Sequence, residues 1–242
     1  MTLRIIAFVL ALLLANAPAF AAVTYDAVSS SSCQGCSGDS WSHTTSGANT
    51  FMLCGGGIQD FAGGTTIDAF HYNGVGNPLT FKDTQDASAE FISLVYKRTA
   101  PTTGANTVAI TYSQAVNSTL GCVTFAGVDQ TTPDGTSAKN SDTDGNVSAS
   151  ITIPADGAGA SFTVYNEDPG ACSNSISSQD ERFEICNADF DVQGTGSTTT
   201  GTGTVAMEVT FAAANPGAIV AVPVNPVAVA PTSAVKRRMS VQ

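Results

Sequence analysis

Apolar side chains alternate with small polar ones along several short segments of the chain. The clearest segment spans residues 147–153, where valine, alanine and isoleucine are separated by serine and threonine. Residues 107–112 and 204–211 show the same pattern. A period of two places the apolar side chains on one face of a β-strand and the polar ones on the other. Because no segment has the longer period of an amphipathic helix, the pattern predicts an all-β protein.

Further strands are predicted where β-branched and aromatic residues cluster, at residues 51–54, 65–72, 90–98, 121–126, 161–166, 182–192 and 218–224. Turn pairs such as Asn73-Gly74 and Asn77-Pro78 separate them at short intervals. About ten or more such strands predict a two-sheet antiparallel β-sandwich, jelly-roll-like in topology. Two glycine-rich segments are expected to be irregular: Gly55–Gly57 as a flexible connection and residues 194–203 (GTGSTTTGTG) as a low-complexity loop.

The first 21 residues have the pattern of a secretory signal peptide. Arg4 precedes an apolar run over residues 5–14, and Ala19-Phe20-Ala21 provides a small-x-small cleavage site. An uncleaved membrane anchor is the alternative, but a spanning helix needs about 20 apolar residues. The predicted organisation is a leader (1–21), a β-sandwich domain (22–225) and an extended, proline-containing basic tail (226–242). The prolines of the C-terminal stretch oppose a membrane-spanning helix, so no transmembrane segment is expected after leader cleavage.

The chain is acidic, with a formal net charge of −11 at pH 7. Cleavage of the leader would remove one base and no acid, so the secreted chain would be more negative still. This charge repels nucleic acid and anionic membrane surfaces, and neither is an expected partner. The negative charge is compatible with three kinds of partner: other copies of the chain, other surface proteins and glycans. The expected location is secreted or cell-surface.

A series of residues along the first half of the predicted domain leads up to the block FAGVDQTTP at Phe125–Pro133. The series consists of His43-Thr44 with Gly47 and Asn49, Tyr72-Asn73-Gly74 with Leu79, and Pro101, Gly104 and Thr107-Val108. Together these residues resemble a recurring β-sandwich module of secreted and virion-surface proteins, mostly of unassigned function. The resemblance implies a jelly-roll-like sandwich and an extracellular or particle-surface setting. It carries no catalytic residues to transfer.

The six cysteines are candidates for disulfides, because the leader would direct the chain out of a reducing cytoplasm. The pairs are expected in the order Cys172–Cys186, Cys54–Cys122 and Cys33–Cys36. Cys172 and Cys186 flank a polar insertion, Cys54 and Cys122 lie in two predicted core strands, and the CxxC pair remains by elimination. The alternatives are a redox or metal site at the CxxC. Zinc there would need His43 and His71 as additional ligands.

Residues 140–146 (NSDTDGN) have the spacing of the front half of a calcium loop. The candidate oxygen ligands are Asn140, Asp142, Asp144 and Asn146. Alternating short side chains wrap a hard cation, and the glycine at the sixth position permits the sharp turn. The twelfth position is Ile151 instead of glutamate, so a further acid, Asp134 or Asp129, would have to complete the site. The alternative is an ordinary Asx-rich turn.

Trp41 is the sole tryptophan and lies in a polar segment, where it forms a candidate sugar-stacking platform with Tyr72 or Phe61. Aromatic faces bind the apolar C–H faces of sugars. The alternative is a tryptophan that covers one end of the sandwich core.

Nothing in the sequence reaches the level of a catalytic motif, and no cofactor is expected unless calcium binds. The chain has only two histidines and neither an HExxH nor a GxSxG motif, which disfavours a metalloprotease or a serine hydrolase. The leading hypothesis is a non-enzymatic extracellular structural or adhesion protein. It would self-assemble by strand addition through sheet edges or through the β-prone residues 218–230. The alternatives are a carbohydrate-binding module, with or without calcium, and a secreted hydrolase.

Overall fold

The computed structural model describes residues 19–60, 63–166, 174–186, 192–211 and 215–229. The described residues form strands and no helices, and the strands pair antiparallel throughout. This confirms the predicted antiparallel β-sandwich. The largest sheet has the order β2-β7-β3-β6-β5, with β4 paired to β7. Its strands are β2 (Thr24–Thr45), β3 (Phe51–Gln59), β4 (Ile67–Tyr72), β5 (Thr80–Asp86), β6 (Phe91–Thr99) and β7 (Gly104–Ala126).

The second large sheet has the order β12-β13-β10-β15-β8. Its strands are β8 (Ala138–Asp142), β10 (Ala158–Asn166), β12 (Asp180–Ile185), β13 (Val192–Thr200) and β15 (Gly217–Val224). A three-stranded sheet consists of β11 (Asn174–Ile176), β14 (Gly203–Phe211) and β9 (Asn146–Ile153). A short ribbon pairs β1 (Ala19–Phe20), inside the predicted leader, with β16 (Ala228–Val229).

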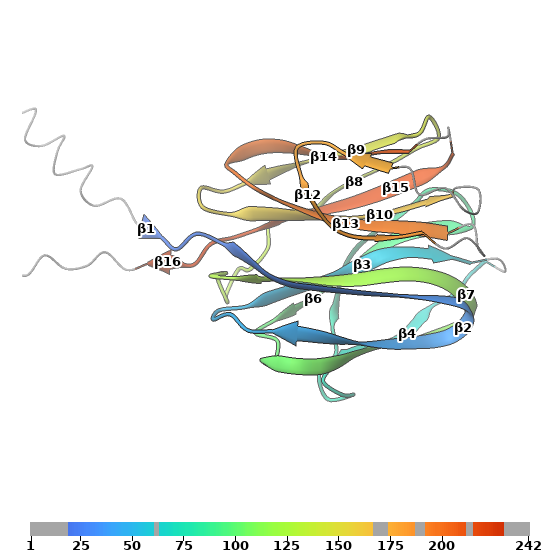
Figure 1. The fold of residues 1–242 in the computed structure, drawn as a ribbon, viewed down its shortest axis with the longest axis horizontal. Coiled ribbons are helices and arrows are strands. Elements are labelled where there is room, and N and C mark those ends of the chain that lie inside the picture. Colours follow the sequence, from blue (N-terminus) through green and yellow to red (C-terminus); the bar gives the residue numbers. More distant parts are fainter. Residues whose placement is uncertain (1–18, 61–62, 167–173, 187–191, 212–214, 230–242) are drawn as a thin grey trace, which may run out of the picture.

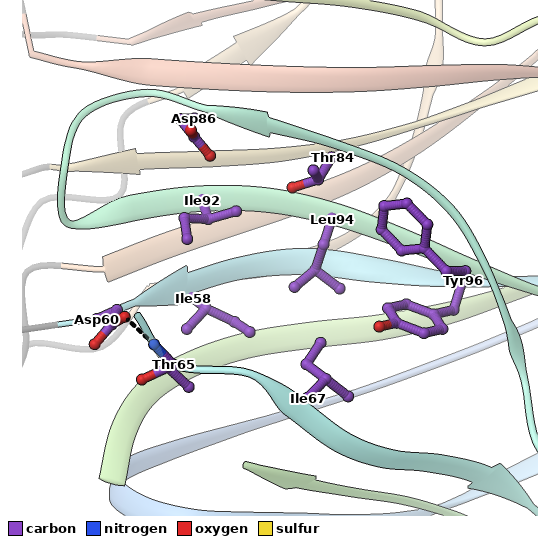
Figure 2. A pocket seen from close by; sticks show the side chains of 10 residues that line it. Ile58, Asp60, Thr65, Ile67, Thr84, Asp86, Ile92, Leu94 and Tyr96 are labelled. Atoms are coloured by element: carbon purple, nitrogen blue, oxygen red, sulfur yellow. Dashed lines mark hydrogen bonds between the residues drawn. The ribbon is translucent and has the colours of Figure 1, made fainter. Parts of the chain in front are cut away.

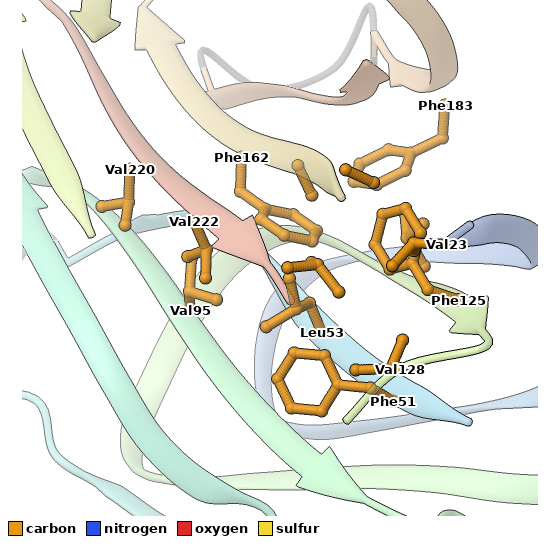
Figure 3. Close-up of a cluster of buried hydrophobic side chains, with 14 residues drawn as sticks. Val23, Phe51, Leu53, Val95, Phe125, Val128, Phe162, Phe183, Val220 and Val222 are labelled. Atoms are coloured by element: carbon orange, nitrogen blue, oxygen red, sulfur yellow. The ribbon is translucent and has the colours of Figure 1, made fainter. Parts of the chain in front are cut away.

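The sandwich is thicker than two sheets, because further β-structure covers the outer face of each large sheet (Figure 1). The central core lies between the two large sheets and includes Phe51, Leu53 and Phe162 (Figure 3). A second core, around Met52 and Leu120, lies on the outer face of the six-stranded sheet. A third core lies between the five-stranded and three-stranded sheets.

The second core exists because β2 and β7 are long enough to fold over it. Their pairing shifts register between Cys33 and Gly38. Beyond that shift, the first half of β7 pairs with β4, whereas its second half pairs with β3. Ile110 from the first half and Leu120 from the second half pack into the same core. The two halves of the bent β2–β7 pair therefore enclose this core from two sides.

Strands that lie between two cores are buried on both faces, so buried and accessible residues do not alternate along them. Every residue of β3 and of β15 is buried, as is almost all of β10. By contrast, β9 covers only one core and shows strict alternation of buried and accessible residues. Period-two patterning therefore marks the outer strands, whereas the inner strands are continuous apolar or small-residue runs.

The two glycine-rich segments predicted to be irregular are strands, and both expectations were wrong. Gly55–Gly57 lies in the middle of buried β3, and most of residues 194–203 belongs to β13 and β14. Small residues occur there because the two large sheets approach closely: a Cβ on Gly57 would lie 2.3 Å from Cγ2 of Val164. The glycines permit contact between layers and do not provide flexibility.

Candidate functional site

A pocket of about 210 Å³ opens on the outer face of the six-stranded sheet, between β4 and the β5–β6 pair (Figure 2). We call it the β5–β6 pocket. Four aliphatic side chains form its apolar lining, namely Ile58, Ile67, Ile92 and Leu94. Two aromatic rings lie at one end, Phe81 and Tyr96, and four polar side chains complete the lining, Asp60, Thr65, Thr84 and Asp86. A concave apolar surface with a few polar groups is the usual form of a ligand site.

A β-bulge in β5 determines which side chains reach the pocket. The register between β5 and β6 shifts between Phe81 and Asp83, so that Lys82 has no partner of its own. Consequently the side chains of Lys82 and Asp83 both point toward the five-stranded sheet. There Lys82 forms an ion pair with Asp134, and Asp83 forms one with Lys139. Phe81 and Thr84 remain on the pocket side. Bulges re-aim side chains in this way and are frequent next to functional sites.

An unbroken row of rings extends from the pocket along the outer face. Phe81 meets Tyr96 at 5.4 Å between ring centroids, Tyr96 meets Phe70 at 5.2 Å, and Phe70 meets Trp41 at 6.3 Å. All three pairs are tilted or edge-on, which is the favoured geometry for aromatic contacts. Phe81, at the end of the row, is 51% exposed and is one of two large apolar residues at the surface of the described chain.

The opposite end of the pocket is polar and acidic. Asp60 is only 2% exposed. Its two carboxylate oxygens accept hydrogen bonds from the backbone N–H groups of Gly63 and Thr65, at 3.1 and 2.7 Å. The hydroxyl oxygen of Thr65 is buried and, within the described residues, has no hydrogen-bond partner. Asp86 is exposed at the pocket mouth. The pocket therefore joins an aromatic end to an anionic end.

The predicted pairing of Trp41 with Tyr72 as a sugar platform was wrong, because Tyr72 is fully buried in the second core. Phe61, the other partner considered, lies outside the described residues. Its hydroxyl donates to the carbonyl of Thr102 at 3.0 Å. Trp41 is half-buried against that core, and its indole N–H donates to the hydroxyl of Ser29 at 3.0 Å. Trp41 thus covers one side of a core, which was the alternative considered for it.

Disulfides join Cys54 to Cys122 and Cys33 to Cys36. Cys54 and Cys122 are directly opposite each other on β3 and β7, with Cα atoms 4.0 Å apart. The CxxC disulfide lies where β2 shifts register against β7. Cys186 is also disulfide-bonded, whereas Cys172, its predicted partner, lies outside the described residues.

The calcium-loop candidates lie at the connection of β8 and β9. Oδ1 of Asp142 accepts the backbone N–H groups of Thr143 and Asp144, at 2.6 and 2.9 Å. This is an Asx-type turn, the alternative given for this motif. Asn140 lies within β8, and the side chain of Asn146 donates to Glu208 at 2.9 Å.

The acids considered as completing ligands are engaged elsewhere: Asp134 binds Lys82 and Lys97, and Asp129 accepts the N–H groups of Thr131 and Thr132. Among the described residues, no group of three or more His, Cys, Asp or Glu side chains has a metal-binding arrangement.

His43 is a buried histidine of β2. It is 1% exposed, with Nδ1 at 2.8 Å from the hydroxyl of Ser29 and Nε2 at 2.7 Å from that of Thr124. Burial lowers its pKa from 6.5 to about 4, against a smaller opposing effect of the Asp26 carboxylate. A neutral imidazole between these two hydroxyls links β2 to β7 through hydrogen bonds.

Sequence reasoning missed the residues that line the β5–β6 pocket. Residues 80–86 were not predicted as a strand, because Lys82 and Asp83 interrupt the alternation that Phe81 would otherwise continue. The one available signal was Phe81 itself, an aromatic residue within a polar segment. The placing of Asp60 and Asp86 in one pocket depends on the packing of β4 against the β5–β6 pair, which sequence spacing does not reveal.

None of the described residues forms a helix long and apolar enough to cross a membrane. No protein-family model matches the chain, and no curated protein matches it in sequence.

Proposed function

We propose that this protein is a non-enzymatic, extracellular adhesion protein that holds a carbohydrate chain in the β5–β6 pocket. The signal-peptide pattern and the two disulfides support an extracellular location. The observation that carries the proposal is the half-exposed ring of Phe81, placed edge-on to Tyr96 at the end of an apolar pocket. Such a ring offers a flat apolar face that the C–H groups of a sugar cover on binding.

The polar lining fits the same ligand class. Sugars present hydroxyl groups around an apolar ring, so their sites combine an aromatic face with a few hydrogen-bonding side chains. Thr65 contributes a buried hydroxyl that lacks a partner within the described residues, and Asp86 contributes an exposed carboxylate. Both groups line the same pocket as the aliphatic side chains of isoleucine and leucine, which can cover the apolar face of a sugar ring.

Self-assembly through residues 218–230, the first mechanism considered, does not fit the position of this segment. Residues 217–224 form β15, which is completely buried and paired on both edges, with β10 and β8. A strand already in the middle of a sheet has no free edge to offer to another chain. We therefore propose adhesion through a pocket in place of assembly through this strand.

A secreted glycoside hydrolase is the second candidate function. The observation in its favour is that two carboxylates, Asp60 and Asp86, line one pocket. Most glycosidases use a pair of carboxylates across the scissile bond. Against it, both oxygens of Asp60 already accept backbone N–H groups, which makes Asp60 a poor general acid.

The test is a glycan array probed with the secreted chain, followed by titration of each hit. Phe81→Ala should abolish binding or weaken it by about tenfold or more, because stacking contributes on the order of 1 kcal/mol beyond buried area. Val75→Ala is the matched control, since Val75 is 84% exposed and does not line the pocket. Absence of any hit for the wild-type chain, or equal binding by Phe81→Ala, would overturn the proposal. Release of shorter products from a bound glycan would favour the hydrolase.

A further inference from the structure

The charge of the β5–β6 pocket indicates which carbohydrate it accepts. Asp60 and Asp86 both line it, and no lysine, arginine or histidine does. Asp86 has no ion pair within the described part of the chain, where the recorded pairs are Lys82 and Lys97 with Asp134, Lys139 with Asp83, and Arg182 with Asp180. The formal charge of the whole chain, −11, has the same sign. Asp86 therefore gives the pocket mouth an exposed negative charge that no described lysine or arginine pairs with.

The fold keeps the neighbouring cations away from the pocket. Lys82 follows Phe81, which faces the pocket, so its side chain points to the other side of the sheet, where it lies 2.6 Å from Asp134. Arg98 lies at the far end of β6 from Ile92, the register partner of Asp86. Its guanidinium donates to Asn77 and to the carbonyl of Pro78. Each nearby cation thus already has an acceptor away from the acidic end.

We infer that the β5–β6 pocket selects a sugar chain that carries free amino groups, with the protonated amine against the exposed carboxylate of Asp86 and the sugar ring against Phe81. This inference rests on the proposed carbohydrate-binding function and adds the class of sugar. An ammonium group makes charge-assisted hydrogen bonds to a carboxylate, which are about twice as strong as neutral ones.

Neutral sugars gain less from the same site. A hydroxyl or an acetamido group at the position of the amine leaves the Asp86 charge uncompensated beside an apolar floor, with Ile92 as its register partner. An anionic sugar is repelled. The selectivity therefore comes from the acidic end, whereas general sugar affinity comes from the rings.

The experiment compares three β-1,4-linked tetrasaccharides that differ only at carbon 2: glucosamine, N-acetylglucosamine and glucose. Binding is measured by calorimetry at low salt, in a buffer acidic enough to protonate the amine. The glucosamine chain should bind about tenfold more tightly than the other two, and added salt should reduce that difference. Asp86→Asn should lower glucosamine binding to the level of the neutral chains and leave the neutral chains unaffected. Asp144→Asn, an equal change of charge in the exposed β8–β9 turn, controls for long-range attraction.

The two proposals fail in different ways. Equal binding of the three chains, lost in Phe81→Ala, would overturn the selection of amino groups and retain the carbohydrate site. Preference for glucosamine that survives in Asp86→Asn, or that falls equally in Asp144→Asn, would also overturn it, because the attraction would then come from the overall charge. No binding of these chains, together with no hit on the glycan array, would overturn both.

Discussion

Gly55 of β3 lies directly beneath the ring of Phe162 in β10, so that a Cβ at this position would be 2.8 Å from Cγ of Phe162. The same Cβ would be 2.5 Å from the backbone oxygen of Leu94 in the neighbouring strand. Gly55 therefore packs closely against two neighbours, Leu94 within its own sheet and Phe162 across the central core. The distance between the two large sheets depends on the missing side chain.

Gly55→Ala should lower the free energy of unfolding by about 1–3 kcal/mol, as overpacking of a core does. A backbone oxygen cannot move aside as the end of a flexible side chain can, so the strand itself must shift. Urea denaturation followed by tryptophan fluorescence measures the change. Gly76→Ala is the control, because nothing lies within 4 Å of its added Cβ. Equal stability of the two variants would mean that the sheets can separate at no cost.

Asp134→Asn should destabilise the protein by about 3–5 kcal/mol, the cost of removing one partner from a buried ion pair. The Asp134 side chain is 4% exposed and lies 2.6 Å from Lys82 and 2.8 Å from Lys97. Both lysines would lose their counter-charge between the sheets. Asp180→Asn provides the comparison: Asp180 is 74% exposed in its pair with Arg182, and its loss should cost about 0–1 kcal/mol. A similar small effect at both positions in thermal denaturation would contradict the assignment of Asp134 as a buried link.

Stability should fall as the pH decreases from about 6.5 to about 4, because of His43. Burial lowers the pKa of His43 in the folded chain, so the unfolded chain binds a proton in this range while the folded chain does not. The contribution is on the order of 3 kcal/mol and is complete once both states are protonated. Denaturant titrations at several pH values measure it. His43→Gln should have a shallower pH dependence over this range, and an unchanged slope would refute the role of His43.

Removal of the Cys54–Cys122 disulfide should cost more stability than removal of the Cys33–Cys36 disulfide. The first bond closes a sequence separation of 68 residues and the second a separation of 3. A cross-link that closes a longer loop restricts the unfolded chain more, with typical values of about 2–4 kcal/mol. The double variants Cys54→Ala/Cys122→Ala and Cys33→Ala/Cys36→Ala make a direct comparison by thermal denaturation. The reverse order would contradict this account.

Period-two patterning identified the strands that border one core. Residues 147–153 and 204–211 were predicted as strands and are paired in the structure as β9 and β14. The inner strands lacked this signal, because β10 and β15 have cores on both sides and need apolar or small residues at every position. Glycines in β3 and β13 were mistaken for loop residues for the same reason, since sheet-to-sheet distance is not encoded in a local pattern.

In the candidate site, too, local sequence patterns did not reveal what depends on packing. Trp41 was selected because it is the sole tryptophan and lies in a polar segment, and Tyr72 was named as a partner for it. Tyr72 is buried, however, and the half-exposed ring is that of Phe81. Whether an aromatic side chain is a core residue or a surface residue depends on what packs over it, and here the folded-over halves of β2 and β7 decide.

By itself the sequence determined the all-β class, the antiparallel sandwich and the pattern of a secretory leader, because strand periodicity, turn residues and leader composition are local properties of the chain. Only the tertiary structure decided the stacking of further β-layers on the sandwich, the burial of Tyr72 and the assembly of Phe81, Tyr96, Asp60 and Asp86 around one pocket. These features depend on register shifts and bulges, in which a displacement of one residue moves a side chain to the opposite face of its sheet.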